Sequence, residues 1–276
     1  MISFPNAKIN LGLNVLERRA DGFHEIESVL VPIQYCDCLE IIMYQGIDAE
    51  NCDMEVLGNT IDEVVSDNLC VKAYELVASN SKLPAVKIRL LKNIPTGAGL
   101  GGGSSDAAFT IKMLNKLFDL ELSNDLMKSM CAELGSDCSF FIENKISMST
   151  GRGEVLEPFE LDLEGKQLVM VQPDLQVSTR KAYERIVPNS IRRGHLQEFL
   201  SQPIETWQEN VENDFESSVF DKNPELKSIK QELYNQGALY ASMTGSGSAL
   251  FGIFDNEVEV SVELSGHRVE KCPFLS

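Results

Sequence analysis

The residues with the clearest chemical potential form a glycine-rich loop, IPTGAGLGGGSSDAA, at positions 94–108. It places five glycines between Gly97 and Gly103, followed by Ser104 and Ser105 at a predicted helix start. Without a Cβ, glycines let backbone N–H groups approach an anion, and a helix N-terminus adds unpaired donors and a favourable dipole. A strand-to-helix turn needs only one or two glycines. The pattern therefore predicts a loop that binds polyphosphate, where the serine hydroxyls can donate to phosphate or bind magnesium.

Other phosphate-binding patterns fit this loop less well. Gly97-x-Gly99-x-x-Gly102 matches the dinucleotide-binding pattern, but that fold needs an acid at the end of a second parallel strand about 20 residues on. The nearest candidate, Glu121, precedes another predicted helix instead. A Walker loop needs Gly-Lys-Ser/Thr after its last glycine, and the H-R-D and D-F-G elements of protein kinases are absent from the sequence.

The first segment alternates between apolar and polar residues, which predicts a strand with one polar face. Lys8, Asn10 and Asn14 lie on that face, and by the strand pattern alone Lys8 is an ordinary exposed lysine. An Asp21-Gly22 turn and further apolar alternation up to Met43 predict that the opening is a β-meander.

The elements that follow alternate between helices and strands. A helix is expected from Asp67, capped by Asp67 or Ser66, and two more begin at Ser104 and Ser123. Strands are expected at 86–92, in QLVMVQP and in SALFGIF, and helices at 104–118, 123–134, 178–187, 224–236 and 256–264. The polar, turn-rich stretch 151–166 predicts a boundary between two domains, 1–158 and 159–276.

The charge composition argues against two classes of binding partner. The net charge of −18 would repel nucleic-acid phosphates and anionic lipid surfaces, so neither a nucleic acid nor a membrane is expected as a partner. No stretch approaches the roughly 20 apolar residues of a membrane span, and no targeting segment is recognised, so we expect a cytoplasmic protein. Oligomeric state cannot be deduced from these patterns.

The seven cysteines form no C-x-x-C pair and are odd in number, which fits a reducing compartment better than a disulfide framework. Cys36 and Cys38 lie two residues apart on a predicted strand and would face the same side. The pair could hold a metal ion or simply pack in the core, and packing is favoured.

Three motifs carry a resemblance to a known family. PTGAGLGGGSSDAA resembles the nucleotide loop of the GHMP kinase superfamily, and PNAKINLGL and MTGSGSALFGIF resemble its two other glycine-containing motifs in the same order. The resemblance implies an α+β, two-domain GHMP kinase fold, with an N-terminal ATP domain like ribosomal protein S5 domain 2 and a C-terminal ferredoxin-like α/β-sandwich domain. It also implies an ATP-dependent small-molecule kinase that uses ATP with Mg²⁺.

The opening PNAKINLGLNVLERRADGFHEI, through its R-x-D-G-F-H stretch, is similar to that of superfamily members acting on a cytidine diphosphate-linked methylerythritol. Such members phosphorylate the 2-hydroxyl of this compound in the non-mevalonate route to isoprenoid precursors. A homoserine or mevalonate type of kinase is the alternative. A catalytically silent nucleotide-binding protein on the same fold is a third reading, disfavoured because Lys8 and Asp137 are present.

The resemblance also implies roles for individual residues. Asp137, in GSDCSFFI, would be the catalytic base, and Lys8 would hold it ionised and lower the pKa of the substrate hydroxyl. Nucleotide contacts are expected from Asn68, Lys92, Pro95, Thr96, Gly97, Ala98, Gly99, Leu100, Gly101, Gly102, Gly103, Ser104 and Ser105. Substrate contacts are expected from Asn10, Phe23, His24, Thr179 and Tyr183.

Some of these expectations stay open at the level of sequence. Asn68 is as well placed to cap its helix as to reach the nucleotide, and Lys92 reads equally as a solvent-exposed lysine. Asp106 suits the first turn of a helix but would repel a phosphate if it faced one. No residue is assigned as a metal ligand.

Overall fold

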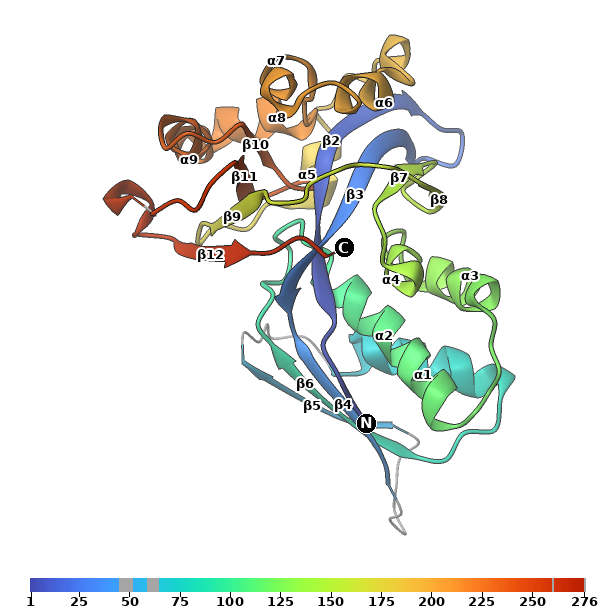
Figure 1. Cartoon of the computed structure of the whole chain (residues 1–276). Helices are drawn as coiled ribbons and strands as arrows, with labels where there is room; N and C mark the ends of the chain where they lie inside the picture. The colour runs from blue at the N-terminus through green and yellow to red at the C-terminus, as the bar shows by residue number, and fades with distance from the viewer. Residues whose placement is uncertain (45–51, 59–64, 260, 276) are drawn as a thin grey trace. The chain divides into compact units, whose positions relative to one another are not determined.

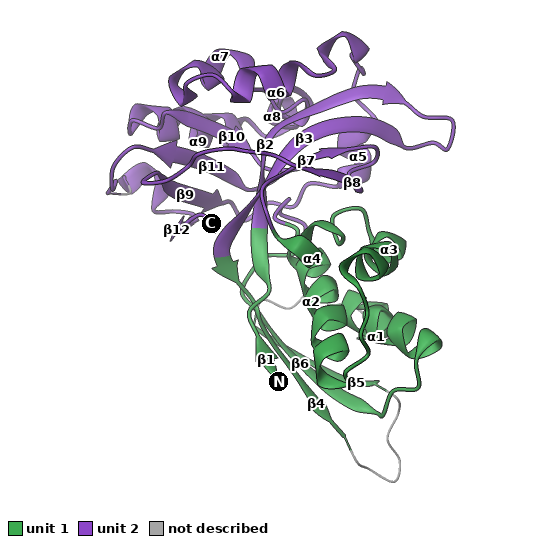
Figure 2. Cartoon of the chain, turned by 45° about the vertical axis from the view of Figure 1, so that its right-hand side comes forward, with its two compact units in different colours: residues 1–7, 35–96, 101–144 green, residues 8–34, 97–100, 145–276 purple. Residues whose placement is uncertain are grey.

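A computed structural model describes residues 1–44, 52–58, 65–259 and 261–275 of the chain (Figure 1). The chain divides into two compact units, each built from several segments (Figure 2). Unit 1 comprises residues 1–7, 35–96 and 101–144, and unit 2 comprises residues 8–34, 97–100 and 145–276. The boundary predicted at residue 158 divides the chain into two continuous domains, whereas each of these units is made of three separate segments. The domain boundary therefore stays a prediction.

The described residues of unit 1 form a four-stranded sheet with four α-helices. The sheet has the order β1-β4-β6-β5, in which β5 pairs parallel to β6 and the other pairings are antiparallel. Helices α1 and α2 contact each other and the sheet, α1 through β5 and α2 through β4. The strands are β1 (Ile2–Ser3), β4 (Cys38–Met43), β5 (Cys52–Gly58) and β6 (Val86–Lys92), and the helices are α1 (Leu69–Asn80), α2 (Gly102–Leu117), α3 (Asn124–Leu134) and α4 (Phe140–Glu143).

Strand β6 alternates strictly between buried and more exposed residues. Val86, Ile88 and Leu90 face the core, and the period of two places Lys92 on the same inward side. Lys92 is therefore buried, and the exposed reading of this residue is wrong.

Unit 2 contains two four-stranded sheets. One has the order β2-β3-β7-β8 and the other the order β10-β11-β9-β12, in which every pairing is antiparallel. The strands are β2 (Asn6–Arg18), β3 (His24–Cys36), β7 (Ser147–Thr150), β8 (Val155–Pro158), β9 (Gln167–Gln172), β10 (Tyr240–Met243), β11 (Leu250–Phe254) and β12 (Arg268–Cys272). Strands β2 and β3 each have one end in unit 1.

The helices of unit 2 are α5 (Thr179–Tyr183), α6 (His195–Leu200), α7 (Trp207–Asn210), α8 (Phe215–Lys222) and α9 (Pro224–Asn235). Apolar residues from α8, α9 and the sheet β10-β11-β9-β12 share one core, which includes Phe215, Leu226, Leu233, Val171 and Leu250. This burial of apolar surface is the main stabilising term for the unit.

Several expected elements are corrected by the structure. The opening is not a single meander, because β4 pairs with β1 and β6 rather than extending the sheet of β2 and β3. The helix expected from Ser104 begins two residues earlier, at Gly102, and the helix expected at 178–187 is confined to Thr179–Tyr183. The expected helix at 256–264, of which residue 260 lies outside the described residues, is only a 3-10 turn at Val262–Leu264.

Helix caps show how local chemistry sets these boundaries. Ser123 caps α3 as expected, by accepting a hydrogen bond from the N–H of Leu126. At α1 the cap is Asn68, whose side chain accepts from the N–H of Cys70, and not Ser66 or Asp67. Ser66 and Asp67 belong instead to a 3-10 turn, Val65–Asp67, that precedes the helix.

Among the described residues, no helix is both long enough and apolar enough to cross a bilayer. All seven cysteines are free thiols. Cys36 ends β3 and Cys38 begins β4, and no cluster of three or more metal-binding side chains occurs in the described part of the chain.

Candidate active site

The glycine loop connects β6 to α2. Gly97, Gly99 and Gly101 all have a positive φ, at +73°, +80° and +71°, which side-chain-bearing residues rarely adopt. Gly101 occupies the N-cap position of α2 without a side-chain cap, so the first N–H groups of the helix are unpaired by any capping side chain. Residues 97–100 count with unit 2 and the rest of the loop with unit 1.

Within unit 2, the loop segment packs tightly on the chain around Thr244. A Cβ built on Gly99 would lie 2.1 Å from the carbonyl oxygen of Thr244, so only glycine fits there. The N–H of Ala249 donates to the carbonyl of Ala98 at 3.2 Å, and the N–H of Lys8 donates to the carbonyl of Leu100 at 3.0 Å. Lys8, the loop segment 97–100 and the chain around Thr244 therefore meet within unit 2.

Lys8 is the centre of a buried polar network in unit 2. Lys8 is only 3% exposed. Its ammonium group donates to Oδ1 of Asn10 at 2.6 Å and to the carbonyl of Gly99 at 3.0 Å. The reading of Lys8 as an exposed lysine is thus wrong, because every residue of β2 from Asn6 to Leu16 is buried. The side-chain nitrogen of Lys8 is therefore held directly against the glycine loop.

Asn10 is fixed from three sides. Its Nδ2 donates to Oγ of Ser28 at 2.8 Å, and its backbone N–H donates to Oγ1 of Thr244 at 3.1 Å. Ser28 in turn donates to the carbonyl of Gly12 at 2.7 Å. Buried networks whose members are all bonded in this way hold side chains in one geometry.

In unit 1, the start of α2 lies beside the turn that carries Asp137. Ser104 hydrogen-bonds the thiol of Cys138, the residue next to Asp137, and burial raises the pKa of that thiol to about 11. Asp137 itself is half-buried, in the turn before α4. The expected base and one of the two loop serines are therefore held near each other in the same unit. Lys8 belongs to the other unit.

Ser105 shows a second feature of this helix start. Its hydroxyl is fully buried, and among the described residues neither it nor Oδ1 of Asp106 has a hydrogen-bond partner. An unpaired buried hydroxyl costs about 1–3 kcal/mol, so it marks a place where a partner is expected to bind.

Lys92 lies between two buried carboxylates of unit 1. Its ammonium group is hydrogen-bonded to Asp37 and donates to Oδ2 of Asp106 at 2.8 Å. Oδ1 of Asp37 accepts from the N–H groups of Asn93 at 2.5 Å and Ile94 at 2.8 Å, at the start of the glycine loop. We call Asp37, Lys92 and Asp106 the loop clamp, because together they join the β3–β4 corner, the end of β6 and the N-terminal part of α2.

Electrostatics of the loop clamp follow from its composition of two acids and one base. Burial, opposed by the charge of Lys92, raises the pKa of Asp106 to about 7. The pKa of Lys92 is raised as well, since the attraction of Asp106 and Asp37 outweighs its burial. The direction of Asp106, which the sequence left open, is thus toward Lys92 and the interior. Gly102 completes this packing, since a Cβ there would lie 2.8 Å from Ile94 and 3.2 Å from Nζ of Lys92.

Asn68 caps α1, and the next residue, Leu69, approaches Gly103 of the loop. A Cβ on Gly103 would be 3.8 Å from Leu69, an ordinary contact. The start of α1 therefore lies close to the loop in space, through Leu69. Its capping role is observed, and a nucleotide contact stays a prediction.

Two of the predicted substrate-binding residues, His24 and Tyr183, contact each other in unit 2. Their rings stack with centroids 4.9 Å apart and an interplanar angle of 19°, and Tyr183 rests edge-on against Phe215. Burial, and then the charge of Arg18, lowers the pKa of His24 below its usual 6.5. The imidazole is accordingly neutral at pH 7, and it has one donor and one acceptor nitrogen.

Phe23 and Thr179 have other partners. Phe23 is 53% exposed at the tip of the β2–β3 hairpin, where the guanidinium of Arg152 lies 4.9 Å from its ring centroid. Thr179, the first residue of α5, shares a 2.8 Å hydrogen bond with the hydroxyl of Ser246 in the MTGSGS segment.

Sequence reasoning missed several residues of this region. Thr244 and Ser246 lie within MTGSGSALFGIF, one of the three family motifs, so that motif is the signal that could have identified them. Lys92 could have been placed inward by the alternation of 86–92. Ser28 and Asp37 carry no sequence signal, because their importance comes only from what packs against them.

Comparisons with known proteins agree with this geometry. The model of the GHMP kinases N terminal domain matches residues 68–145, and that of the GHMP kinases C terminal domain matches residues 196–265. The fold and the loop network together define a GHMP kinase, which confirms the expected fold class.

Individual relatives identify one family within the GHMP kinases. A 4-diphosphocytidyl-2-C-methyl-D-erythritol kinase of Azobacteroides pseudotrichonymphae genomovar. CFP2 is 47% identical over 254 residues, which cover 92% of this chain and 93% of the relative. One of Cytophaga hutchinsonii is 45% identical over 273 residues, covering 99% and 98%. A crystal structure of 4-(cytidine 5'-diphospho)-2C-methyl-D-erythritol kinase superposes with a TM-score of 0.79 at 28% identity, covering 99% of each chain. The chain belongs to the 4-diphosphocytidyl-2-C-methyl-D-erythritol kinase family.

Proposed function

We propose that this protein transfers the γ-phosphoryl group of ATP to the 2-hydroxyl of 4-diphosphocytidyl-2-C-methyl-D-erythritol, in the non-mevalonate pathway of isoprenoid precursor biosynthesis. Full-length identity to relatives of that name supports the substrate. The observation that carries the chemistry is the buried ammonium group of Lys8, bonded to the Gly99 carbonyl within the glycine loop. We place this reaction in the cytoplasm, which the seven free thiols favour.

ATP is proposed to bind with its phosphates on the glycine loop. The positive φ angles of Gly97, Gly99 and Gly101 and the uncapped start of α2 supply close backbone donors. The remaining proposed contacts are those of Asn68, Lys92 and the loop from Pro95 to Ser105. Lys92 would act mainly by shaping the loop, because its ammonium group is already engaged by two carboxylates.

Phosphoryl transfer needs an aligned hydroxyl, a proton acceptor and stabilised phosphate oxygens rather than covalent help from the protein. Asp137 is proposed to accept the proton of the substrate hydroxyl. Lys8 is proposed to supply the positive charge that stabilises the developing oxyanion, held in place by Asn10 and Gly99.

The cytosine end of the substrate is proposed to bind at the stacked pair of His24 and Tyr183. A flat base gains about 1–3 kcal/mol by stacking on an aromatic ring, and a neutral imidazole can also read a base edge. Phe23 offers an exposed ring nearby in sequence. Asn10 and Thr179 are proposed to contact the rest of the substrate.

Magnesium is proposed to accompany ATP, and the residues present fit it in one respect. Ser105 supplies a buried oxygen that no side chain or backbone group of the described ranges hydrogen-bonds, which suits a hard cation that keeps several waters and phosphate ligands. When bound, the ion would neutralise charge on the phosphates.

The decisive experiment incubates the protein with ATP, Mg²⁺ and 4-diphosphocytidyl-2-C-methyl-D-erythritol and follows ADP release and the phosphorus NMR spectrum of the product. A new phosphate on the 2-hydroxyl is expected, and Asp137→Asn should lower kcat about 10²–10⁴-fold. Folded protein that binds ATP but transfers nothing would contradict the substrate, and homoserine and mevalonate would then be tried. Unchanged turnover in Asp137→Asn would remove Asp137 from the mechanism.

A further inference from the structure

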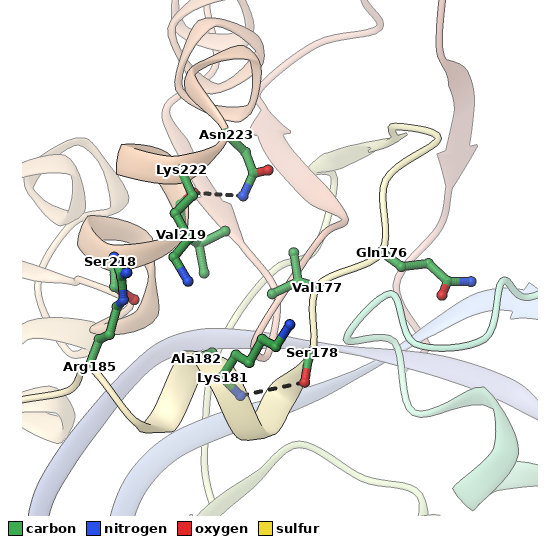
Figure 3. A pocket seen from close by; sticks show the side chains of 10 residues that line it. All are labelled: Gln176, Val177, Ser178, Lys181, Ala182, Arg185, Ser218, Val219, Lys222 and Asn223. Atoms are coloured by element: carbon green, nitrogen blue, oxygen red, sulfur yellow. Dashed lines mark hydrogen bonds between the residues drawn. The ribbon is translucent and has the colours of Figure 1, made fainter.

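A separate hollow of about 210 Å³ lies in unit 2, away from the residues that form the Lys8 network. It is lined by α5 with the segment that precedes it, and by the C-terminal half of α8 up to the start of α9 (Figure 3). We call it the α5–α8 pocket. The lining residues are Gln176, Val177, Ser178, Lys181, Ala182, Arg185, Ser218, Val219, Lys222 and Asn223.

The charge of this pocket is unlike that of the protein as a whole. Three of its lining residues, Lys181, Arg185 and Lys222, are cationic and none is acidic, although the chain carries a net charge of −18. Figure 3 shows the three side chains around the same hollow, with Lys181 below it and Lys222 above it.

These cations are also not neutralised by the protein. Arg180, one residue before Lys181, pairs with Glu184 at 3.6 Å. In contrast, none of the three pocket cations has an ion pair or hydrogen bond from its side chain within the described part of the chain. Holding three like charges around one hollow is unfavourable, and a bound anion would relieve the repulsion.

The size and donors of the pocket restrict the anion. Its volume lies below the roughly 300–1,000 Å³ of pockets for drug-sized ligands, so the occupant is a small group. Guanidinium and ammonium donors on several sides suit the oxygens of phosphate or diphosphate. The hydroxyl of Ser178, which accepts from the N–H of Lys181 at 3.5 Å, keeps its proton to donate.

We propose that the α5–α8 pocket is a binding site for a small phosphate-bearing anion, separate from the glycine loop. The segment 178–185, which contains α5, presents two sets of residues. Thr179 and Tyr183 contact Ser246 and His24, whereas Ser178, Lys181, Ala182 and Arg185 line the pocket. An anion in the pocket therefore binds the same helix that carries two of the proposed substrate contacts.

The test is a titration with inorganic pyrophosphate, without Mg²⁺, followed by calorimetry and by backbone amide shifts. The pocket variant is Lys181→Gln/Arg185→Gln/Lys222→Gln. The matched control is Lys82→Gln/Lys116→Gln/Lys227→Gln, which removes the same charge from three other exposed lysines. All six side chains are exposed, so both variants should fold.

Wild type and control are expected to show amide shifts at residues 178–185 and 218–223. The pocket variant should lose those shifts and bind at this site at least about tenfold more weakly. Shifts confined to the glycine loop, or equal binding at residues 178–185 and 218–223 in the pocket variant, would overturn the proposal. Binding needs no turnover, so this result is independent of the proposed function.

Steady-state kinetics then identify the molecule that supplies the phosphate. This part of the experiment rests on the proposed function. If the diphosphate of the substrate itself occupies the pocket, the pocket variant should raise the KM for 4-diphosphocytidyl-2-C-methyl-D-erythritol about tenfold at unchanged kcat. If a free anion occupies it, pyrophosphate binding is lost while this KM stays the same.

Discussion

Nζ of Lys92 lies 2.8 Å from Oδ2 of Asp106, and both residues are almost completely buried beneath the glycine loop. Asp37 binds the same ammonium group and also accepts two N–H groups from the residues that open the loop. The loop thus rests on a charged base as well as on glycine packing. Because one cation serves two carboxylates, removing it should be far more damaging than changing either acid.

Lys92→Met should lower the free energy of unfolding by about 3–5 kcal/mol, since it leaves two buried acids without a counter-charge. Denaturant unfolding measures this effect. Lys128→Met is the control, because Lys128 pairs with Glu143 at the partly exposed surface, where a pair contributes about 1 kcal/mol or less. Equal losses in the two variants would contradict the loop clamp.

Asp106→Asn should be much milder than Lys92→Met in the same unfolding experiment. Burial raises the pKa of Asp106 to about 7 and so disfavours its charged form, and a neutral amide that still accepts from Lys92 is therefore a close substitute. Asp37 remains to balance the cation. A loss as large as that of Lys92→Met would show that both carboxylates must be charged.

Gly99→Ala should destabilise the protein by more than about 2 kcal/mol. Left-handed backbone strain accounts for about 1–2 kcal/mol of this, and the added Cβ would collide with the Thr244 carbonyl. Gly97→Ala is the matched control, because Gly97 has a similar φ but nothing within 4 Å of its Cβ. Chemical denaturation should separate the two variants, and identical losses would mean that the Thr244 contact does not restrict the loop.

The pKa of His24, followed by NMR titration of its ring protons, should fall below 6.5. Arg18→Gln should raise it part of the way, because burial is the larger cause and the charge of Arg18 the smaller. A pKa depressed in the folded state means that the unfolded state binds more protons, so this contribution to stability is present above pH 6.5 and is lost as the pH falls below it. His24→Phe, which keeps a ring against Tyr183, should remove that pH dependence. A His24 pKa at or above 6.5 would contradict the prediction.

Tyr183→Ala should raise the KM for 4-diphosphocytidyl-2-C-methyl-D-erythritol about 5- to 150-fold, the equivalent of about 1–3 kcal/mol of lost base stacking. The KM for ATP should stay unchanged, since Tyr183 belongs to the His24 pair and not to the glycine loop. Tyr183→Phe keeps the ring and should behave like wild type in steady-state kinetics. A rise in both KM values would indicate general damage to unit 2 instead of a lost substrate contact.

Much of the site could be predicted from local sequence because its geometry is local. The positive φ of Gly97, Gly99 and Gly101 follows from the glycine loop, and Ser123 caps α3 as its type and place indicate. The two-residue period of 86–92 places Lys92 on the buried face of its strand, so this local pattern favours the inward reading of Lys92 over the exposed one. Such features depend on a few neighbouring residues, and a single sequence displays them directly.

Tertiary structure alone decided which distant residues meet. Asn10 and Thr244 are 234 positions apart and share a hydrogen bond, and Lys92 lies 55 positions from Asp37. Burial of Lys8 depends on both faces of β2 being covered, which its alternating pattern does not encode. These contacts depend on sheet order and packing across the chain, whereas periodicity reports only which side of one element a residue faces. The sequence by itself therefore determined the loop chemistry and the family, and the tertiary structure decided which charges and hydroxyls hold that loop in place.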